Sequence, residues 1–487
     1  MSIFLLLCLA LLLGVHRLVC RTAGDALPRA VDPMVWFVTP WFFCIAIFAM
    51  PIIVHREQMG IYHAAYIMAC FMAFWFGQLI HLFGAPRKNI TPNPKKADFV
   101  RYALFFAILG FIGYAAKIAD QLLVTGLSLQ DRLMPSANLG EVRALRNAAS
   151  MAGASGPFSR LHFLSVFSLV FIAVYLLAGK GELGGSVRGL RLKLTAAATF
   201  GLVAFNSLFI EAGRVDFVIF ASLVLCVLIL DRQRTMLKTF AAKRIAVKLS
   251  IVGLVLCVLI ISAFAAIYFL RARIGTYAPP ELLLHLTHRA SFDGDLLGLL
   301  GRSVFLQTAL LQLSYVTTSI ATLCYYLDVD SAQFPGPFYG VANFPGLFDR
   351  IVFRVDSDSY AADWFDQANY PLAFRGFASN VWSTWFRDLA LDITRPLVPL
   401  FLFVFGFVSR LVVAAAYSSR QPFQVILGAA ILTVLAFSAF HTITNREIIW
   451  STLRVCVLVI GFLWLKSFLV LRPRHRSSTS SDSFGAG

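Results

Sequence analysis

Long apolar stretches recur along the chain, and short segments rich in charged residues separate them. Each stretch has roughly 18 to 23 residues, the length a helix needs to cross about 30 Å of hydrocarbon. Strands of membrane barrels are shorter and alternate apolar with polar positions, which this chain does not do. The pattern therefore predicts an all-α polytopic integral membrane protein with about eleven transmembrane helices. The predicted spans are Ile3–Cys20, Val35–Val54, Ile61–Phe83, Phe99–Ala119, Leu161–Leu177, Leu194–Ile210, Val215–Leu230, Ile251–Phe269, Pro396–Ala416, Phe423–Ala439 and Ile448–Leu469.

Composition supports exposure to lipid. Of the 487 residues, 59% are hydrophobic and only 14% are charged, more apolar surface than a water-soluble globule can bury. Most of the eight cysteines fall inside or beside the apolar stretches, so no disulfide framework is expected.

The distribution of charge predicts the orientation of the spans. The net charge is +17, and its lysines and arginines concentrate in alternate short loops, most densely between Arg232 and Lys248. The positive-inside rule places such loops in the cytoplasm, with the N-terminus outside and the C-terminus cytoplasmic. Because this rule explains the positive charge, we expect no nucleic-acid partner.

The same topology predicts four parts. Residues 1–270 form transmembrane helices 1–8 with short loops, apart from an external loop at about 120–160. Residues 271–393 form one long extracytoplasmic loop bearing amphipathic helices, 394–471 form transmembrane helices 9–11, and 472–487 form a disordered cytoplasmic tail. Within the long loop, Ser303–Leu327 is uncharged and long enough to cross. A crossing would put the basic C-terminal tail outside, so we expect an amphipathic or re-entrant helix there.

The basic residues on the predicted external side are nearly all arginine, and Lys117 is the only external lysine. Arginine offers a planar fork of donors that matches phosphate oxygens, whereas lysine is a hydrated point charge. This asymmetry predicts an external polyanion or pyrophosphate as ligand. Pairing of a single arginine with the loop's own carboxylates or with anionic lipid is the alternative. Arginines expected at headgroup depth include Arg214, Arg271, Arg273, Arg395, Arg446 and Arg454.

The long loop is also rich in aromatic residues, among them Tyr325, Trp382 and Trp385. Aromatic rings stack on sugars, but they also form interface belts and ordinary cores. Acidic pairs such as Asp328 with Asp330 have a spacing that can hold a divalent metal, yet such pairs are more often solvated turns. We therefore expect no metal and no cofactor.

The segment Ser379–Asp392, SNVWSTWFRDLALD, opens a late span. It resembles the Asn-Val-Tyr-Thr, Arg, Asp-aromatic-Gly signature of bacterial oligosaccharide repeat-unit polymerases of the Wzy type. In addition, Glu211–Leu225 is similar to a Gly-Ser-Arg turn of that family, and Ser314–Leu327 to its tyrosine-bearing loop helix. The plan of many spans with one long late external loop agrees with the family as well.

The chain departs from the family pattern at Ala212, Trp382 and Leu391. A distant relative that acts on another glycan, or an O-antigen-ligase-like glycan transferase, is therefore an alternative. A flippase for lipid-linked oligosaccharide, or a polysaccharide exporter, is the competing class. Transporters tend to carry charges at the bilayer midplane and internal repeats, whereas these charges gather at the outer edge, so the enzyme is favoured.

The resemblance implies metal-independent glycosyl transfer at the outer face of the bacterial cytoplasmic membrane. Its substrates would be polyprenyl-pyrophosphate-linked oligosaccharides, with polyprenyl pyrophosphate leaving, and its partners membrane lipid and a chain-length-regulating co-polymerase. On this hypothesis the catalytic arginines are Arg214, Arg387 and Arg446, and Asp388 or His441 is the base. The expected substrate-binding residues are Arg271, Arg273, Arg395, Arg454, Tyr325, Trp382 and Trp385.

Overall fold

The computed structural model describes residues 1–25, 27–50, 52–84, 102–130, 145, 156–178, 187–211, 215–236, 290–292, 304–329, 337, 343, 383–419, 421–444 and 446–470. Within these ranges, seven helices are long and apolar enough to cross a membrane, and two shorter apolar helices accompany them. The described chain is thus that of a helical membrane protein.

The first group of helices runs up to residue 236. It consists of α1 (Ser2–Thr22), α2 (Pro33–Ala49), α3 (Ile61–Gly84), α5 (Ala103–Thr125), α8 (Val166–Ala178), α10 (Val187–Phe205) and α11 (Val215–Met236). Three short helical turns join them: η1 (Arg29–Val31), η2 (Ser159–Ser165) and the π-helical turn η3 (Asn206–Ile210).

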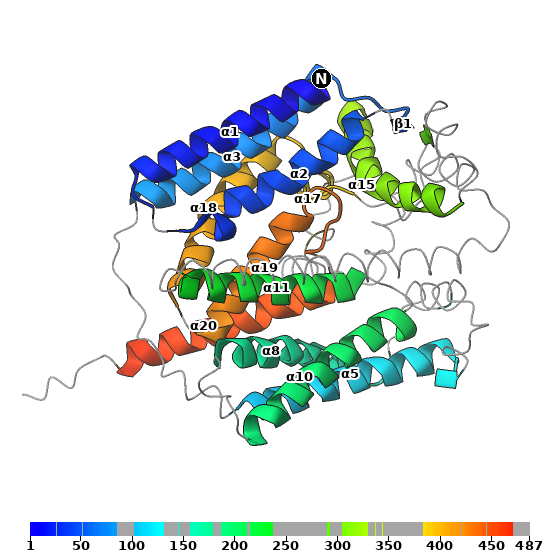
Figure 1. Ribbon diagram of the computed structural model, residues 1–487, viewed down its shortest axis with the longest axis vertical. Helices are drawn as coiled ribbons and strands as arrows, with labels where there is room; N and C mark the ends of the chain where they lie inside the picture. Colours follow the sequence, from blue (N-terminus) through cyan, green and yellow to red (C-terminus); the bar gives the residue numbers. More distant parts are fainter. Residues whose placement is uncertain are drawn as a thin grey trace, which may run out of the picture.

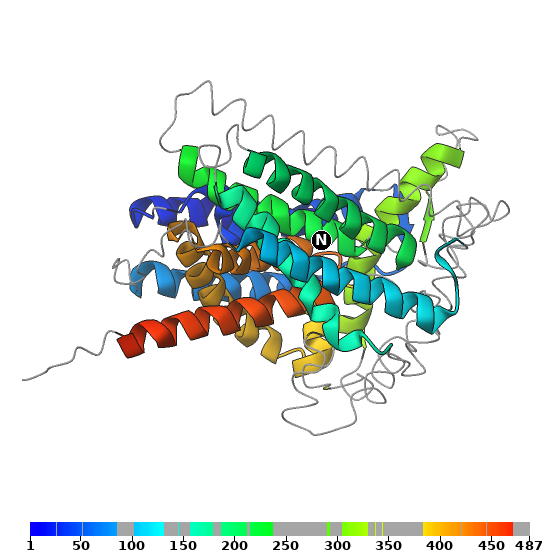
Figure 2. The ribbon, with the colours of Figure 1, turned by 90° about the horizontal axis from the view of Figure 1, so that it is seen from below.

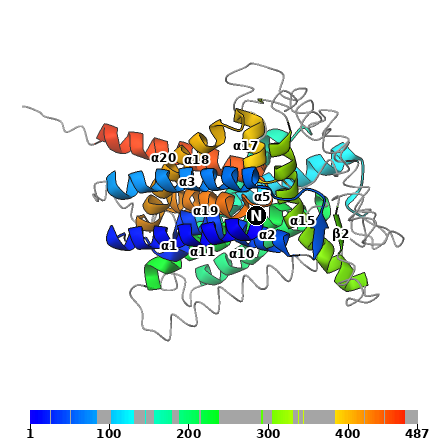
Figure 3. The ribbon, with the colours of Figure 1, turned by 90° about the horizontal axis from the view of Figure 1, so that it is seen from above.

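The second group holds α15 (Val304–Asp328), α17 (Trp385–Ile393), α18 (Leu397–Ser418), α19 (Pro422–Phe437) and α20 (Glu447–Val470). Two short strands, β1 (Ile53–His55) and β2 (Ala290–Phe292), pair antiparallel with Ile53 opposite Phe292. Together with α15 they lie at the end of the bundle away from the C-terminal end of α20 (Figure 3).

A helix lies at every predicted span except Ile251–Phe269, which falls outside the described residues, as do most of 271–393 and the tail 472–487. The second helix is shorter than predicted: it ends at Ala49 rather than Val54, because β1 begins at Ile53. Its start is set locally, since the Asp32 side chain accepts a hydrogen bond from the Met34 amide at 2.9 Å and Pro33 occupies the first turn. The described residues of the uncharged Ser303–Leu327 segment lie in the helix α15 (Val304–Asp328).

Helix α19 occupies the centre of the bundle (Figure 1). It is apolar around its circumference and buried along most of its length, and it packs against α2, α8, α11, α18 and α20. Helices α5, α8 and α10 pack together on one side of it, as the view from below in Figure 2 shows. On the opposite side, α1, α2, α3 and α18 form the other packed group.

The outer faces of the peripheral helices are apolar. On α1, Leu5, Leu9 and Leu12 are buried, whereas Leu7 and Leu11 are 66% and 69% exposed. A soluble protein would cover such a face with polar residues, so the two-sided apolarity fits a helix with protein on one side and lipid on the other.

Helices α3 and α18 form an extensive helix pair because two glycines let their backbones meet. A Cβ atom on Gly77 would overlap the carbonyl oxygen of Phe403, and one on Gly406 would overlap that of Phe74. Small residues at such crossings are the usual means by which membrane helices gain close contact.

We therefore expect Gly77→Val to force α3 and α18 apart and to destabilise the protein by about 1–3 kcal/mol, the usual cost of overpacking. Thermal unfolding of purified protein in detergent measures the change. The matched control is Gly201→Ala in α10, where a Cβ meets no atom within 4 Å. An unchanged unfolding temperature for Gly77→Val would contradict the close crossing.

Candidate functional site

The short helix α17 places a pair of opposite charges in the protein interior. Its residues from Trp385 to Asp392 are all buried. The helix begins here because the Thr384 hydroxyl accepts a hydrogen bond from the Arg387 amide at 3.2 Å, which caps the N-terminus. Arg387 and Asp388, both 3% exposed, therefore sit in its first turn.

The surroundings of Arg387 satisfy only part of its guanidinium. Nε donates to Oδ1 of Asp388 at 2.9 Å, and Cζ lies 5.2 Å from the centroid of the Tyr326 ring. The Ser383 hydroxyl donates to the Asp388 carboxylate, 2.9 Å from Oδ2. Within the described part of the chain, Nη1 of Arg387 is buried and has no hydrogen-bond partner. A buried donor without an acceptor costs free energy, so this nitrogen marks a place where an anionic group can bind.

Asn343 joins α17 to the segment before α20. Its amide nitrogen Nδ2 and its backbone N–H both donate to Oδ2 of Asp392, at 2.6 and 3.0 Å. Its side-chain oxygen accepts from Nε1 of Trp385 at 2.8 Å and from the Thr444 hydroxyl at 3.1 Å. One asparagine thus connects three segments that are far apart in the sequence.

Residues 438–444 and 446, which we call the elbow, lie between α19 and α20 and beside α17. The carbonyl of Ser438 accepts from the Trp385 amide at 2.8 Å, and its hydroxyl accepts from Nε1 of Trp41 at 3.0 Å. The Ser319 hydroxyl of α15 donates to the Ala439 carbonyl at 3.0 Å. The elbow is therefore fixed by α2, α15 and α17 together.

The elbow carries two further predicted site residues in direct contact. Nη2 of Arg446 lies 3.1 Å from Nε2 of His441. A guanidinium can only donate, so Nε2 accepts and the imidazole is neutral. Burial and the charge of Arg446 together lower the pKa of His441 well below its ordinary value of 6.5.

Four predicted site residues lie on α17 and on the elbow packed beside it. They are Arg387 and Asp388 on α17, and His441 and Arg446 on the elbow. Trp385 takes part as well, but by packing: its ring lies 5.0 Å from that of Phe405. Four predicted residues lie outside the described ranges, namely Arg214, Arg271, Arg273 and Trp382.

Arg395 has a structural partner of its own. Its guanidinium donates hydrogen bonds to the carbonyl oxygens of Leu327, at 3.1 Å, and Val329. Arg395 thereby caps the C-terminal end of α15. The preceding Thr394 has φ 72°, an unusual backbone conformation for a non-glycine residue, and it turns the chain from α17 into α18.

Two other predicted substrate-binding residues lie away from the α17 charge pair. Tyr325 is half-buried, and its ring is 5.6 Å from that of Tyr326. The Tyr326 ring is the one that the Arg387 guanidinium contacts. Arg454 is exposed on α20, with Cζ 4.4 Å from the centroid of the Trp450 ring.

A second polar cluster lies among α1, α2, α3 and α18, and the sequence analysis missed it. Nη1 of Arg410 is 3.3 Å from Oδ1 of Asp32, and Nη2 contacts Asp25. The other oxygen of Asp32 is 2.8 Å from Nε2 of His16, and Nε1 of Trp75 donates to Nδ1 of that ring at 3.1 Å. A lone arginine inside the apolar stretch 397–418 is the signal that could have revealed the cluster, since intramembrane charges need partners.

The same cluster holds side chains of the type that bind metal ions. Ligand atoms of His16, Cys20 and Asp32 lie within 4.8 Å of one another. However, the indole N–H of Trp75 can only donate, so Nδ1 of His16 keeps its lone pair and Nε2 carries the proton toward Asp32. Nη1 of Arg410 lies 3.3 Å from the same carboxylate, so Asp32 is already paired with a cation.

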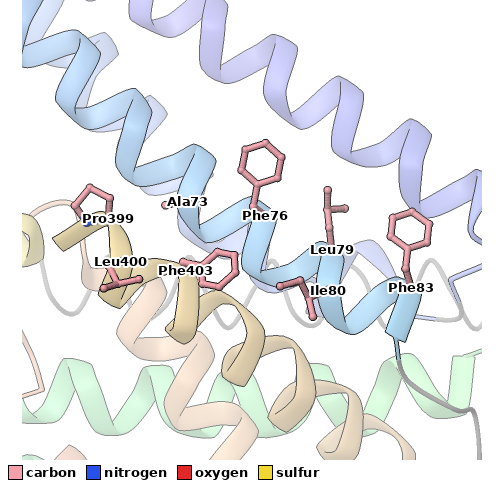
Figure 4. Close-up of a pocket in the computed structure, with 8 residues that line it drawn as sticks. All are labelled: Ala73, Phe76, Leu79, Ile80, Phe83, Pro399, Leu400 and Phe403. Atoms are coloured by element: carbon pink, nitrogen blue, oxygen red, sulfur yellow. The ribbon is translucent and has the colours of Figure 1, made fainter. Parts of the chain in front are cut away.

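An apolar groove of about 710 Å³ runs between α3 and α18 (Figure 4). Its lining consists of Ala73, Phe76, Leu79, Ile80, Phe83, Pro399, Leu400 and Phe403. None of these side chains can donate a proton or bind an anion, so the groove can hold hydrocarbon but offers no chemistry.

No family model, curated protein or solved structure matches this chain.

The network around Arg410 gives a prediction about stability. Arg410→Met leaves the carboxylates of Asp25 and Asp32, which are 14% and 7% exposed, without their cation. We expect a loss of about 3–5 kcal/mol in the free energy of unfolding, because the remaining charges are largely buried. Arg454→Met on the exposed face of α20 is the control, with an expected loss of about 0.5–1 kcal/mol from its contact with Trp450. Equal unfolding temperatures for the two variants in detergent would show that the buried pairing contributes little.

The lowered pKa of His441 predicts a pH dependence. Between the ordinary value of 6.5 and the lower value in the folded protein, the unfolded chain holds a proton that the folded protein does not. The free energy of unfolding therefore falls as the pH drops below 6.5, by at most about 1.4 kcal/mol per pH unit for one proton. His441→Gln, which keeps an acceptor for Arg446, should lack this component. Unfolding temperatures at about pH 7.5 and about pH 5.5 test it: the wild-type protein should lose more stability than the variant over this range.

Proposed function

We propose that this protein is a membrane glycosyltransferase that joins oligosaccharides carried on a polyprenyl pyrophosphate. The observation that carries the proposal is the buried Arg387, paired with Asp388 and holding one guanidinium nitrogen without a partner among the described residues. Arginine is the side chain best suited to a diphosphate, because it offers a fixed fork of donors that keeps its charge.

Adjacent residues such as Arg387 and Asp388 do not tie two helices together. The ion pair itself therefore costs desolvation without linking two helices, unlike that of Arg410 with Asp32, and the contact of Arg387 with another helix is the one to the Tyr326 ring. A buried ion pair that does not join two helices favours a role in binding or catalysis. The resemblance of Ser379–Asp392 to the repeat-unit polymerase signature points to the same residues.

In the proposed reaction, a hydroxyl oxygen of the acceptor oligosaccharide attacks the anomeric carbon of the donor. The bond between that carbon and the pyrophosphate oxygen breaks, the hydroxyl proton passes to a base, and polyprenyl pyrophosphate leaves. Arg387 and Arg446 would stabilise the negative charge that grows on the leaving diphosphate. This is differential binding, since the charge is larger in the transition state than in the bound substrate.

Of the two candidate bases, Asp388 suits the role better. Its oxygens accept from Arg387 and Ser383 but retain further lone pairs, because each carboxylate oxygen can accept twice. In His441 the only lone pair of the neutral ring is directed at Arg446. We therefore assign Asp388 as proton acceptor and His441 as a residue that orients Arg446.

A transporter that moves lipid-linked oligosaccharide without forming bonds is the second candidate. The cluster of Arg410, Asp32 and His16 supports it, because charged groups inside the membrane often mark a transport path. The tight pairing of that cluster favours a structural role, so we rank the transporter second.

Reconstitution with lipid-linked oligosaccharide separates the two candidates. For the wild-type protein we expect longer glycan and released polyprenyl pyrophosphate. Arg387→Lys keeps the charge but loses the planar fork, and we expect turnover to fall by about a hundredfold or more. Arg191→Lys, on the exposed face of α10 near its start, is the matched control and should retain activity.

Full turnover in Arg387→Lys would remove Arg387 from the mechanism. Relocated but chemically unchanged substrate in the wild-type reaction would replace the enzyme with the transporter.

A further inference from the structure

Lys117, the one lysine that the sequence predicts on the external side, is buried in an ion pair. Its Nζ lies 3.0 Å from Oε2 of Glu447, and the lysine side chain is 11% exposed whereas that of Glu447 is 48% exposed. The ammonium also lies 5.8 Å from the centroid of the Tyr114 ring, one turn earlier on α5. Removing an ammonium group from water costs several kcal/mol, so a lysine inside the candidate span Ala103–Thr125 is a candidate for a functional role.

The partner of Lys117 is next to a candidate diphosphate ligand. Glu447 is the first residue of α20 and follows Arg446, whose guanidinium contacts His441. The Arg446 amide donates to the Ile443 carbonyl at 3.0 Å, and its own carbonyl accepts from the Trp450 amide at the same distance. The backbone at Arg446 is thus fixed to the elbow on one side and to α20 on the other, and the ion pair fixes that junction against α5.

Two further acidic residues, Glu211 and Asp216, act electrostatically on Lys117 and His441. Glu211 accepts a hydrogen bond from Nδ2 of Asn206, at 2.9 Å, where the π-helical turn η3 ends, and its charge acts on Lys117. The charge of Asp216, in the first turn of α11, acts on His441. Single π-helical turns are frequent at functional sites, because they redirect side chains from the regular helical positions.

From this arrangement we infer that Lys117 is a positioning residue for the anion-binding site. Through Glu447 it holds the start of α20 so that Arg446, with His441 against it, presents its guanidinium to a diphosphate. In this inference Lys117 acts through Glu447, with which its ammonium is paired, and not by contact with the substrate. The inference rests on the proposed function only in the choice of diphosphate as ligand.

The test is calorimetric titration of the purified full-length protein with inorganic pyrophosphate. Lys117→Met should weaken binding by about tenfold or more, the scale seen when a side chain that orients a ligand-binding group is lost. Arg446→Met should weaken binding at least as much. Because Lys117 acts through Arg446, the double variant should bind no more weakly than Arg446→Met alone.

Two controls separate positioning from a merely structural role. Lys117→Arg keeps a positive charge paired with Glu447, so pyrophosphate binding should stay within about twofold of the wild-type value. Lys117→Met removes that charge and is the variant in which a loss of folding could occur. Unfolding temperatures identify any variant that fails to fold. In that case the double exchange of Lys117→Met with Glu447→Gln, which leaves neither partner of the ion pair charged, takes the place of Lys117→Met and should weaken binding in the same way.

The outcomes have distinct meanings. Unchanged pyrophosphate binding in folded Lys117→Met, or additive losses in the double variant, would overturn the inference. Wild-type protein that binds pyrophosphate but forms no glycan would overturn the proposed function and leave the positioning role supported by the binding data. Wild-type protein that does not bind pyrophosphate would overturn both.

Discussion

The structure depends on one constraint: charged and polar groups inside an apolar bundle must find partners within the protein, because lipid offers none. Three arginine or lysine side chains of the described interior illustrate this constraint. Arg410 pairs with Asp25 and Asp32, Lys117 pairs with Glu447, and Arg387 pairs with its neighbour Asp388. The first two pairs join helices that are distant in the sequence, so they hold the bundle together. The third joins neighbours, and its guanidinium is only partly satisfied.

The candidate site lies where helical regularity stops. Between α19 and α20 the chain turns through the elbow, and its backbone groups are satisfied by Trp385 and Ser319 from other elements. The Asn343 side chain completes this network, because it donates a hydrogen bond to Asp392 and accepts one from Thr444. Such discontinuities are tolerated in a membrane protein only when the protein covers them, and the covering residues here are the ones that place Arg387 and His441.

The polar clusters around Arg410 and Arg387 differ in which guanidinium nitrogens are paired with carboxylates. Around His16 the tautomer is fixed by Trp75, and Asp32 is paired with both His16 and Arg410. Among the described residues Nη1 of Arg410 makes no hydrogen bond, but it lies 3.3 Å from Oδ1 of Asp32. Nη1 of Arg387 is likewise buried without a hydrogen-bond partner there, and Arg387 pairs with Asp388 through Nε. An anion could therefore bind Nη1 of Arg387 without displacing Asp388, which is the physical ground for proposing an enzyme that binds diphosphate ahead of a transporter.

The sequence by itself located the helices of the described residues and predicted Arg387 and Asp388 as site residues. Apolar length alone located the helices, because a span needs a fixed number of residues whatever its neighbours are. The segment Ser379–Asp392 pointed to Arg387 and Asp388. Only the tertiary structure decided the pairings, such as Lys117 with Glu447 and Asn343 with Asp392. The physical reason is that hydropathy shows how deep a residue lies in the membrane but not which way it faces. The nearly uniform apolar surface of helices such as α19 leaves their rotation to be set by packing and by buried charge pairs.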